Sequence, residues 1–180
     1  MKEYIAYHGT NSSNARKIND SKCFVYKKDR VGYLGTGSYF FDESYKRAFD
    51  WAKYITERKR RKDPSVLRVE IMIPEDKIFD TTDPNGENVQ KFEFWEEELL
   101  PGLLKENGLN IKGPGGIEGV IYNTICDFEK YDAVRAYTHT YTGIERKHQV
   151  STRIPNTIEI CLRKNKYVKK INIEKGDQIV

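Results

Sequence analysis

The segment SVLRVEIMIP, residues 65–74, constrains the fold of this chain more than any other feature. Val69, Ile71 and Ile73 alternate with Arg68, Glu70 and Met72, and Val66 and Leu67 precede them. Alternation of this kind places successive side chains on opposite faces of a β-strand. The segment is the best strand prediction in the chain, so the fold is expected to be built around a sheet.

Further strands are predicted at residues 3–8, 38–41, 119–122, from Asp132 onward through AVRAYTHTYTG, at 156–164 and at 167–173. Helices are predicted at residues 11–19, 42–61 and 91–107, with Pro101 expected to kink or divide the last one. Asn11, Ser12 or Ser13 can cap the first helix, and Asp42 or Ser44 the second. Strands dominate and helices lie mostly in the first half, so the predicted class is α+β.

Length and composition predict one globular domain over residues 1–180. Hydrophobic residues make up 38% of the chain, and its 12 Tyr and 8 Phe add area that can be buried. The net charge of +4 permits an acidic partner but does not demand one. Three widely spaced cysteines fit a reducing cytoplasm, and no apolar run approaches the roughly 20 residues of a membrane span.

Several chemistries are excluded or weakened by missing motifs. The glycine-rich loop at residues 32–37 lacks the G-x-S-x-G of a serine nucleophile and the Gly-Lys-Ser/Thr ending of a phosphate loop. No cysteine pair has zinc spacing. Asp80 and Asp83 could hold a cation, but a strand-end turn explains them equally well. No metal site is therefore predicted.

The chain contains three histidines, which differ in their surroundings. His8, in YHGT, ends a predicted strand and precedes a glycine, where a histidine is often a capping or turn residue. His139 lies in a polar aromatic strand, and a structural role is expected for it. His148, in ERKHQ, is typical of a solvated loop. None of the three defines a catalytic site when taken alone.

Four short motifs, taken together in chain order, indicate a more specific fold and function. They are YHGT at residues 7–10, GTGSYFF at 35–41, AFDWA at 48–52 and PNTIEICL at 155–162. Together they resemble the ADP-ribosyltransferase fold in its His-Tyr-Glu class. That class includes poly(ADP-ribose)-polymerase-like and diphtheria-toxin-like catalytic domains and many small bacterial toxin and phage-defence domains. The resemblance runs roughly from Tyr4 to Ile171.

The resemblance implies two small, mostly antiparallel sheets with an NAD cleft between them, and no metal. It implies that His8 hydrogen-bonds a ribose hydroxyl, that backbone groups of Gly9 hold the nicotinamide carboxamide, and that Tyr39 stacks on the nicotinamide ring. A second aromatic wall stays unassigned, because the aligned position falls near Asp50, between two aromatic residues. The implied NAD-binding residues are His8, Gly9, Thr10, Gly37, Ser38, Tyr39, Phe49 and Trp51.

By the same resemblance, Glu159 is the catalytic carboxylate, with His8 and Tyr39 as its partners. A carboxylate near the ribose stabilises the positive charge that develops as nicotinamide leaves. Strand alternation puts Ile158 and Ile160 on the face opposite Glu159, so Glu159 faces either solvent or the cleft, and the resemblance favours the cleft. A related class uses Arg, Ser-Thr-Ser and Glu. Here Ser151 lies only eight residues before Glu159, so that class is rejected.

The acceptor side of the cleft is expected to lie under residues 138–156. Arg146, Lys147, His148 and Arg153 make this segment basic, and KRRK at residues 59–62 adds further cations. A polyanion would be steered toward such a surface, so nucleic acid is favoured over protein as the acceptor. For each of these basic residues taken alone, a solvent-exposed loop is the simpler explanation.

The overall expectation is a cytoplasmic NAD-dependent ADP-ribosyltransferase, a toxin of a toxin–antitoxin or phage-defence system, with a neutralising partner and no membrane association. This role is an analogy, because a fold does not set a biological role. Two alternatives stay open: an NAD glycohydrolase, in which water replaces the acceptor, and a non-catalytic nucleic-acid-binding module of the same fold.

Overall fold

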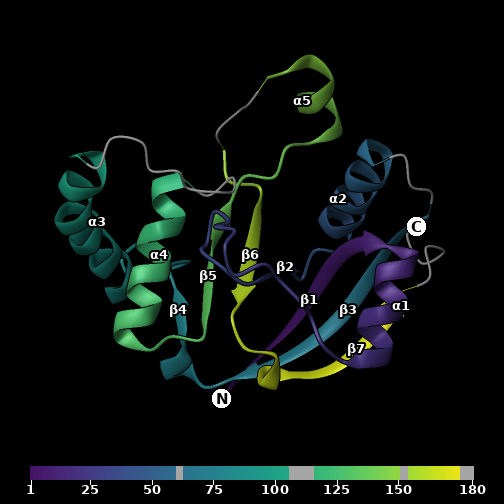
Figure 1. Ribbon diagram of the computed structural model, residues 1–180, viewed down its shortest axis with the longest axis horizontal. Helices are drawn as coiled ribbons and strands as arrows, with labels where there is room; N and C mark the ends of the chain where they lie inside the picture. Colours follow the sequence, from purple (N-terminus) through teal and green to yellow (C-terminus); the bar gives the residue numbers. More distant parts are fainter. Residues whose placement is uncertain (60–62, 106–115, 151–153, 175–180) are drawn as a thin grey trace.

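The computed structural model describes residues 1–59, 63–105, 116–150 and 154–174. Within these residues the strands form a seven-stranded mixed sheet of order β4-β5-β6-β2-β1-β3-β7 (Figure 1). All strand pairs are antiparallel except β4 with β5. The strands are β1 (Lys2–Asn11), β2 (Ser38–Asp42), β3 (Pro64–Ile73), β4 (Ile78–Asp80), β5 (Ala133–Thr138), β6 (Thr157–Leu162) and β7 (Val168–Glu174).

Five α-helices and two short 3₁₀ turns complete the described fold. They are α1 (Ser12–Ser21), α2 (Tyr45–Arg58), η1 (Glu75–Lys77), α3 (Glu87–Lys105), α4 (Gly116–Glu129), α5 (Gly143–His148) and η2 (Asn165–Tyr167). The Asn11 side chain accepts from the Asn14 N–H and caps α1, and the Ser44 side chain does the same for α2 through Arg47. Both caps are among the residues predicted from sequence.

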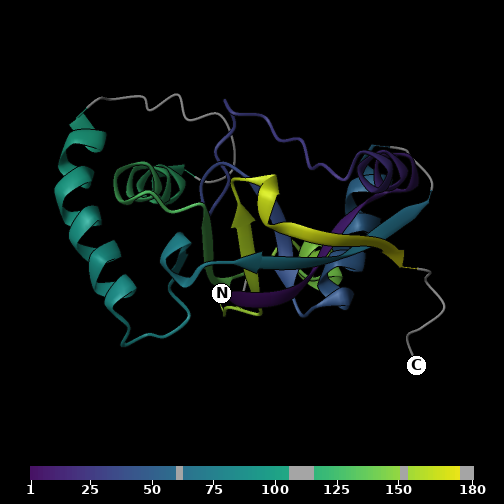
Figure 2. The same cartoon turned by 90° about the horizontal axis from the view of Figure 1, so that it is seen from below.

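Helices α1 and α2 cover opposite faces of β1 and β3. Helix α1 buries Ala15 in a cluster that includes Leu67, whereas α2 buries Ala48 beside Val66. Because Val66 and Leu67 are consecutive in a strand, they point to opposite faces. Helix α4 covers the other end of the sheet with Ile121 and its neighbours, and α3 lies outside α4 (Figures 1 and 2).

The sheet is narrowest where β1 meets β2. These strands pair over two positions, Ala6 with Asp42 and Tyr7 with Phe41, whereas β1 pairs with β3 along its whole length. The expectation of two separate sheets is thus replaced by one sheet whose halves, β7-β3-β1 and β2-β6-β5-β4, join at a two-residue seam. The α+β class is confirmed.

One predicted strand is wrong, and two short elements were not predicted. Residues 119–122, predicted as a strand, lie in α4, where Ile121, Tyr122 and Ile125 pack against the sheet. Tertiary packing thus overrides the strand preference of a β-branched run. The sequence prediction also missed β4 and α5, which are three and six residues long. Pro101 lies inside α3 without ending it.

Within the described part of the chain, no helix combines the length and apolar character that a bilayer crossing requires.

Candidate active site

Three neighbouring strands at the centre of the sheet carry the predicted catalytic residues. His8 lies on β1, Tyr39 on β2 and Glu159 on β6, and the sheet order places β2 between the other two strands. Tyr39 pairs with Cys161, and Glu159 pairs with Phe41. Tyr39 and Glu159 therefore share one face as diagonal neighbours, a separation that long side chains can span.

His8 occupies the point where β1 and β2 separate. Its Nδ1–H donates to the Tyr39 carbonyl oxygen at 2.8 Å, so the ring bridges the two strands just beyond their last pair. The ring packs against Phe24 and Phe40, which places it on the face opposite Tyr39 and Glu159. His8 therefore does not share a face of the sheet with Tyr39 and Glu159.

The surroundings of His8 fix its protonation state. Burial lowers its pKa because the charged imidazolium is poorly solvated there, and the bond to Tyr39 opposes this shift. The neutral ring with its proton on Nδ1 presents Nε2 as a hydrogen-bond acceptor. That is the atom that could accept from a sugar hydroxyl.

Tyr39 anchors the glycine-rich loop that precedes it. Its hydroxyl accepts from the Leu34 N–H at 2.9 Å and donates to the Gly35 carbonyl at 2.7 Å. A Cβ on Gly32 would lie 2.2 Å from the same hydroxyl, so the loop wraps tightly around the ring's end. Burial raises the pKa of Tyr39 far above that of a free tyrosine. The hydroxyl therefore has a structural role that the sequence prediction did not include.

Glu159 is a partly buried carboxylate held by threonines. Its Oε1 accepts from the Thr140 hydroxyl at 2.9 Å. Burial raises its pKa, and the Thr140 and Thr138 hydroxyls oppose that effect. Thr138 is near enough to act on the carboxylate, yet its hydroxyl makes no well-formed hydrogen bond within the described residues. The Thr138 hydroxyl is buried, so a substrate hydroxyl at this place would meet the Glu159 carboxylate as its hydrogen-bond acceptor.

The glycines predicted to approach NAD are in close contact with the protein itself. A Cβ on Gly9 would lie 2.0 Å from the Ala48 carbonyl oxygen, so α2 packs directly on β1 at this residue. A Cβ on Gly37 would lie 2.6 Å from the Cys161 sulfur. Thr10 and Ser38 are buried beside them. Close packing is therefore a sufficient reason for glycine at both positions, independently of any ligand that their backbone groups bind.

The two candidates for a second aromatic wall lie on α2 but differ in their surroundings. Phe49 stacks on Tyr45 and has the Lys53 ammonium over its ring. Trp51 is 38% exposed and is not part of the core. The guanidinium of Arg146 lies near it, 5.9 Å from the ring centroid.

The described part of the basic segment predicted to face the acceptor, residues 139–150, forms an arm that projects beyond the ends of β5 and β6 and carries α5 (Figure 1). Arg146 stacks on Tyr54 of α2 at 3.9 Å, so the arm contacts the opposite half of the molecule. Lys147 and His148 are exposed. Arg153 and residues 60–62 lie outside the described residues. His139 pairs with Glu145 at 3.0 Å and supports the arm, in keeping with its predicted structural role.

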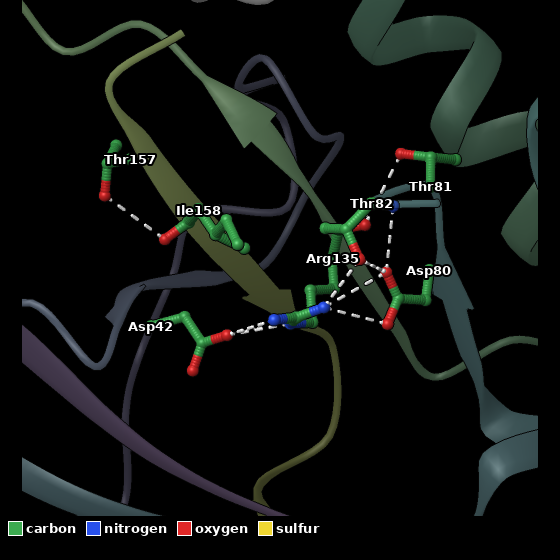
Figure 3. Close-up of polar contacts among 7 residues, drawn as sticks. All are labelled: Asp42, Asp80, Thr81, Thr82, Arg135, Thr157 and Ile158. Atoms are coloured by element: carbon green, nitrogen blue, oxygen red, sulfur yellow. Dashed lines mark hydrogen bonds and ion pairs between the residues drawn. The ribbon is translucent and has the colours of Figure 1, made fainter. Parts of the chain in front are cut away.

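A second polar cluster, missed by the sequence prediction, surrounds Arg135 (Figure 3). Its guanidinium binds Asp42 at 2.7 Å and Asp80 at 3.1 Å, and donates to the Thr82 hydroxyl at 2.7 Å. The Asp80 carboxylate also accepts from Thr82, which agrees with the strand-end turn. The sequence feature that could have pointed to this cluster is a single arginine among the mostly apolar residues of β5. Among the described residues, no group of three or more metal-ligating side chains is present.

Comparisons with known proteins add one relative. The chain is 27% identical to an uncharacterized protein, MJ0359, of Methanocaldococcus jannaschii over 187 aligned positions, covering 92% of this chain and 84% of that protein. No family model matches the chain. No solved structure matches it either.

Proposed function

We propose that this protein is an NAD-dependent ADP-ribosyltransferase that transfers ADP-ribose to a macromolecular acceptor and releases nicotinamide. The observation that carries the proposal is Glu159, a partly buried carboxylate whose strand lies next to the one carrying Tyr39. Both residues lie close to the place where β1, with His8, leaves β2. A carboxylate with a pKa shifted by burial at a strand junction is typical of a reactive site.

The reaction breaks the bond between the ribose C1 and the nicotinamide nitrogen. The bonding electrons leave with the ring, which becomes neutral, and the ribose gains positive charge. The ionised Glu159 carboxylate stabilises that charge, and an acceptor hydroxyl or amine then bonds to C1 and loses its proton to solvent or to the carboxylate. Only the ionised form can act, so nicotinamide release should fall as pH drops through the raised pKa of Glu159.

The roles of the other two residues follow from their contacts. With its proton on Nδ1, His8 can accept a hydrogen bond from a ribose hydroxyl at Nε2. The Tyr39 ring can stack on nicotinamide while its hydroxyl holds the loop. Trp51, partly exposed beneath Arg146, is favoured over Phe49 as the second wall because the Phe49 ring is already stacked on Tyr45 and lies beside Lys53.

The test incubates the protein with NAD labelled in the adenylate, together with RNA, DNA or cell protein separately. Transfer is expected to at least one acceptor with wild type, and to be lost by about 100-fold or more in Glu159→Gln, in line with the loss of one electrostatic catalytic group. Tyr39→Phe keeps the ring and should retain transfer if the fold holds. Glu3→Gln, at an exposed position on β1, is the matched control.

The outcomes of this assay separate the alternatives. Nicotinamide release without labelled macromolecule would identify an NAD glycohydrolase. Neither release nor NAD-dependent thermal stabilisation would leave a non-catalytic module and contradict the proposal. The toxin role is tested separately by expressing wild type and Glu159→Gln, because equal growth with both would argue against it.

A further inference from the structure

A cavity of about 610 Å³ lies away from Glu159, at the end of β6 where the chain turns toward β7. Its lining comes from the last two turns of α4 and the loop that follows it, the β6–β7 corner, η1 and the loop before β2. Arg163 in this lining follows Glu159 by four residues, roughly 13 Å at the rise of a strand. Neither Glu159, His8 nor Tyr39 contributes to the cavity.

The lining is strongly basic. It contains two carboxylates, Asp127 and Asp132, against six cations, which are Lys28, Lys77, Lys130, Arg163, Lys164 and Lys166. That excess of four positive charges equals the net charge of the whole chain, so the charges of the remaining residues sum to zero. The C-terminal end of α4 contributes roughly half a negative charge, which is small against this excess.

The two carboxylates are already engaged. Asp132 accepts from Lys164 at 2.6 Å and from the Tyr167 hydroxyl at 2.6 Å, and Asp127 binds Arg163 at 2.6 Å. Lys28 has no ion-pair partner among the described residues, and the Lys130 ammonium donates only to a backbone carbonyl. Positive charge therefore remains in the cavity after internal pairing.

From this we propose that the cavity binds phosphate groups of a nucleotide or of a nucleic-acid strand. Ammonium and guanidinium groups are donors only, so the ligand must supply acceptors and negative charge, as phosphate does. The volume exceeds that of a lone phosphate and lies within the range of small-molecule sites. Tyr26, whose hydroxyl donates to the Arg163 carbonyl at 2.8 Å, holds the loop against the basic corner.

The test is a fluorescence-anisotropy titration of the full chain with a labelled single-stranded RNA, without NAD. Lys28→Glu with Lys130→Glu reverses two exposed cations of the cavity, and affinity is expected to fall at least tenfold. Lys17→Glu with Lys169→Glu makes the same charge change at exposed positions outside the cavity and should alter affinity less than threefold. Wild-type affinity should also weaken with salt, less steeply in the cavity variant.

Adenosine monophosphate and inorganic pyrophosphate serve as competitors. Displacement of the RNA by a competitor at a concentration similar to that of the RNA would assign the site to free nucleotides. Failure of both competitors to displace the RNA would assign the site to a nucleic-acid strand. Either result supports the phosphate site. Equal losses in the two double variants, or no binding of RNA and nucleotide by folded wild type, would overturn it. The titration contains no NAD and the variants lie outside the Glu159 site, so the result is independent of the transferase proposal.

Discussion

Glu159 lies between Phe41 on β2 and Ala136 on β5, with Thr140 as its hydrogen-bond donor. Burial favours the protonated carboxyl, so its pKa is raised in the folded protein relative to the unfolded chain. The stability that this group contributes is present at low pH and is lost as pH rises through the raised pKa. At neutral pH the ionised carboxylate therefore weakens the fold, as often happens at sites selected for chemistry.

Glu159→Gln should consequently raise the melting temperature at pH 7.5, because a neutral amide avoids the poorly solvated charge. The advantage should shrink as pH falls through the raised pKa of Glu159 and should be gone below about 4, where glutamate is protonated in both states. Thermal unfolding followed across this pH range measures the effect. Glu3→Gln, at an exposed position, is the control and should change little. A lower melting temperature for Glu159→Gln at pH 7.5 would contradict the argument.

At the level of elements, β1 and α2 pack backbone against backbone. Gly9 approaches the Ala48 carbonyl and the Ala52 amide of α2 so closely that a Cβ would lie 2.0 Å and 3.1 Å from them. Neither atom is on a flexible side chain, so α2 itself would have to shift. This contact also positions Trp51 and Tyr54, which meet Arg146 of the arm.

Gly9→Ala should therefore lower the free energy of unfolding by about 1–3 kcal/mol, the usual cost of overpacking, because α2 must move away from β1. Chemical denaturation measures the change. Gly102→Ala, in α3 with nothing within 4 Å of the added carbon, should be neutral or slightly stabilising. If both variants behave alike, the packing role assigned to Gly9 is wrong.

The sequence predicted long or strongly alternating elements well, and short or tertiary ones poorly. Strand β3 was evident from its alternation, and the Asn11 and Ser44 caps from their residue types. Helix α4 was mistaken for a strand over residues 119–122, because its burial depends on contacts with β5 and β6 that no local pattern reveals. Strand β4 is too short to show a period.

The same difference between local patterns and tertiary contacts decides which features of the candidate site could be predicted. The motifs singled out His8, Tyr39 and Glu159, and the structure places them on adjacent strands. The bond from His8 to the Tyr39 carbonyl, the loop held by the Tyr39 hydroxyl and the packing of Gly9 depend on distant segments. The Arg135 cluster brings together β2, β4 and β5, which no spacing in the sequence indicates.

For the whole molecule, Arg135 helps join the two halves of the sheet across the narrow seam. It binds Asp42 and Asp80 within one half, and its guanidinium lies 5.4 Å from the Tyr4 ring on β1 in the other half. Burial raises the pKa of Asp42 even beside this cation. Removing the arginine would leave two largely buried carboxylates facing each other.

Arg135→Met should lower the free energy of unfolding by about 3 kcal/mol at neutral pH, as for a buried pair that loses one partner. The deficit should become smaller in acid, where Asp42, whose pKa is raised by burial, becomes protonated. Denaturant unfolding at pH 7.5 and pH 4 measures both values. Lys46→Met, which breaks an exposed pair with Asp50, is the matched control and should cost less than about 0.5 kcal/mol. A loss no larger than this control would mean that Arg135 does not help to join the two halves of the sheet.

The loop before β2 also restricts how this protein can evolve. A Cβ on Gly119 of α4 would lie 2.1 Å from the Gly32 carbonyl oxygen, and a Cβ on Gly32 would meet the Tyr39 hydroxyl. A mutation at any one of these positions is therefore disfavoured unless another changes with it. In divergent descendants of this chain, positions 32, 39 and 119 should be inherited as a set, so that one lineage keeps all three residues and another replaces them together.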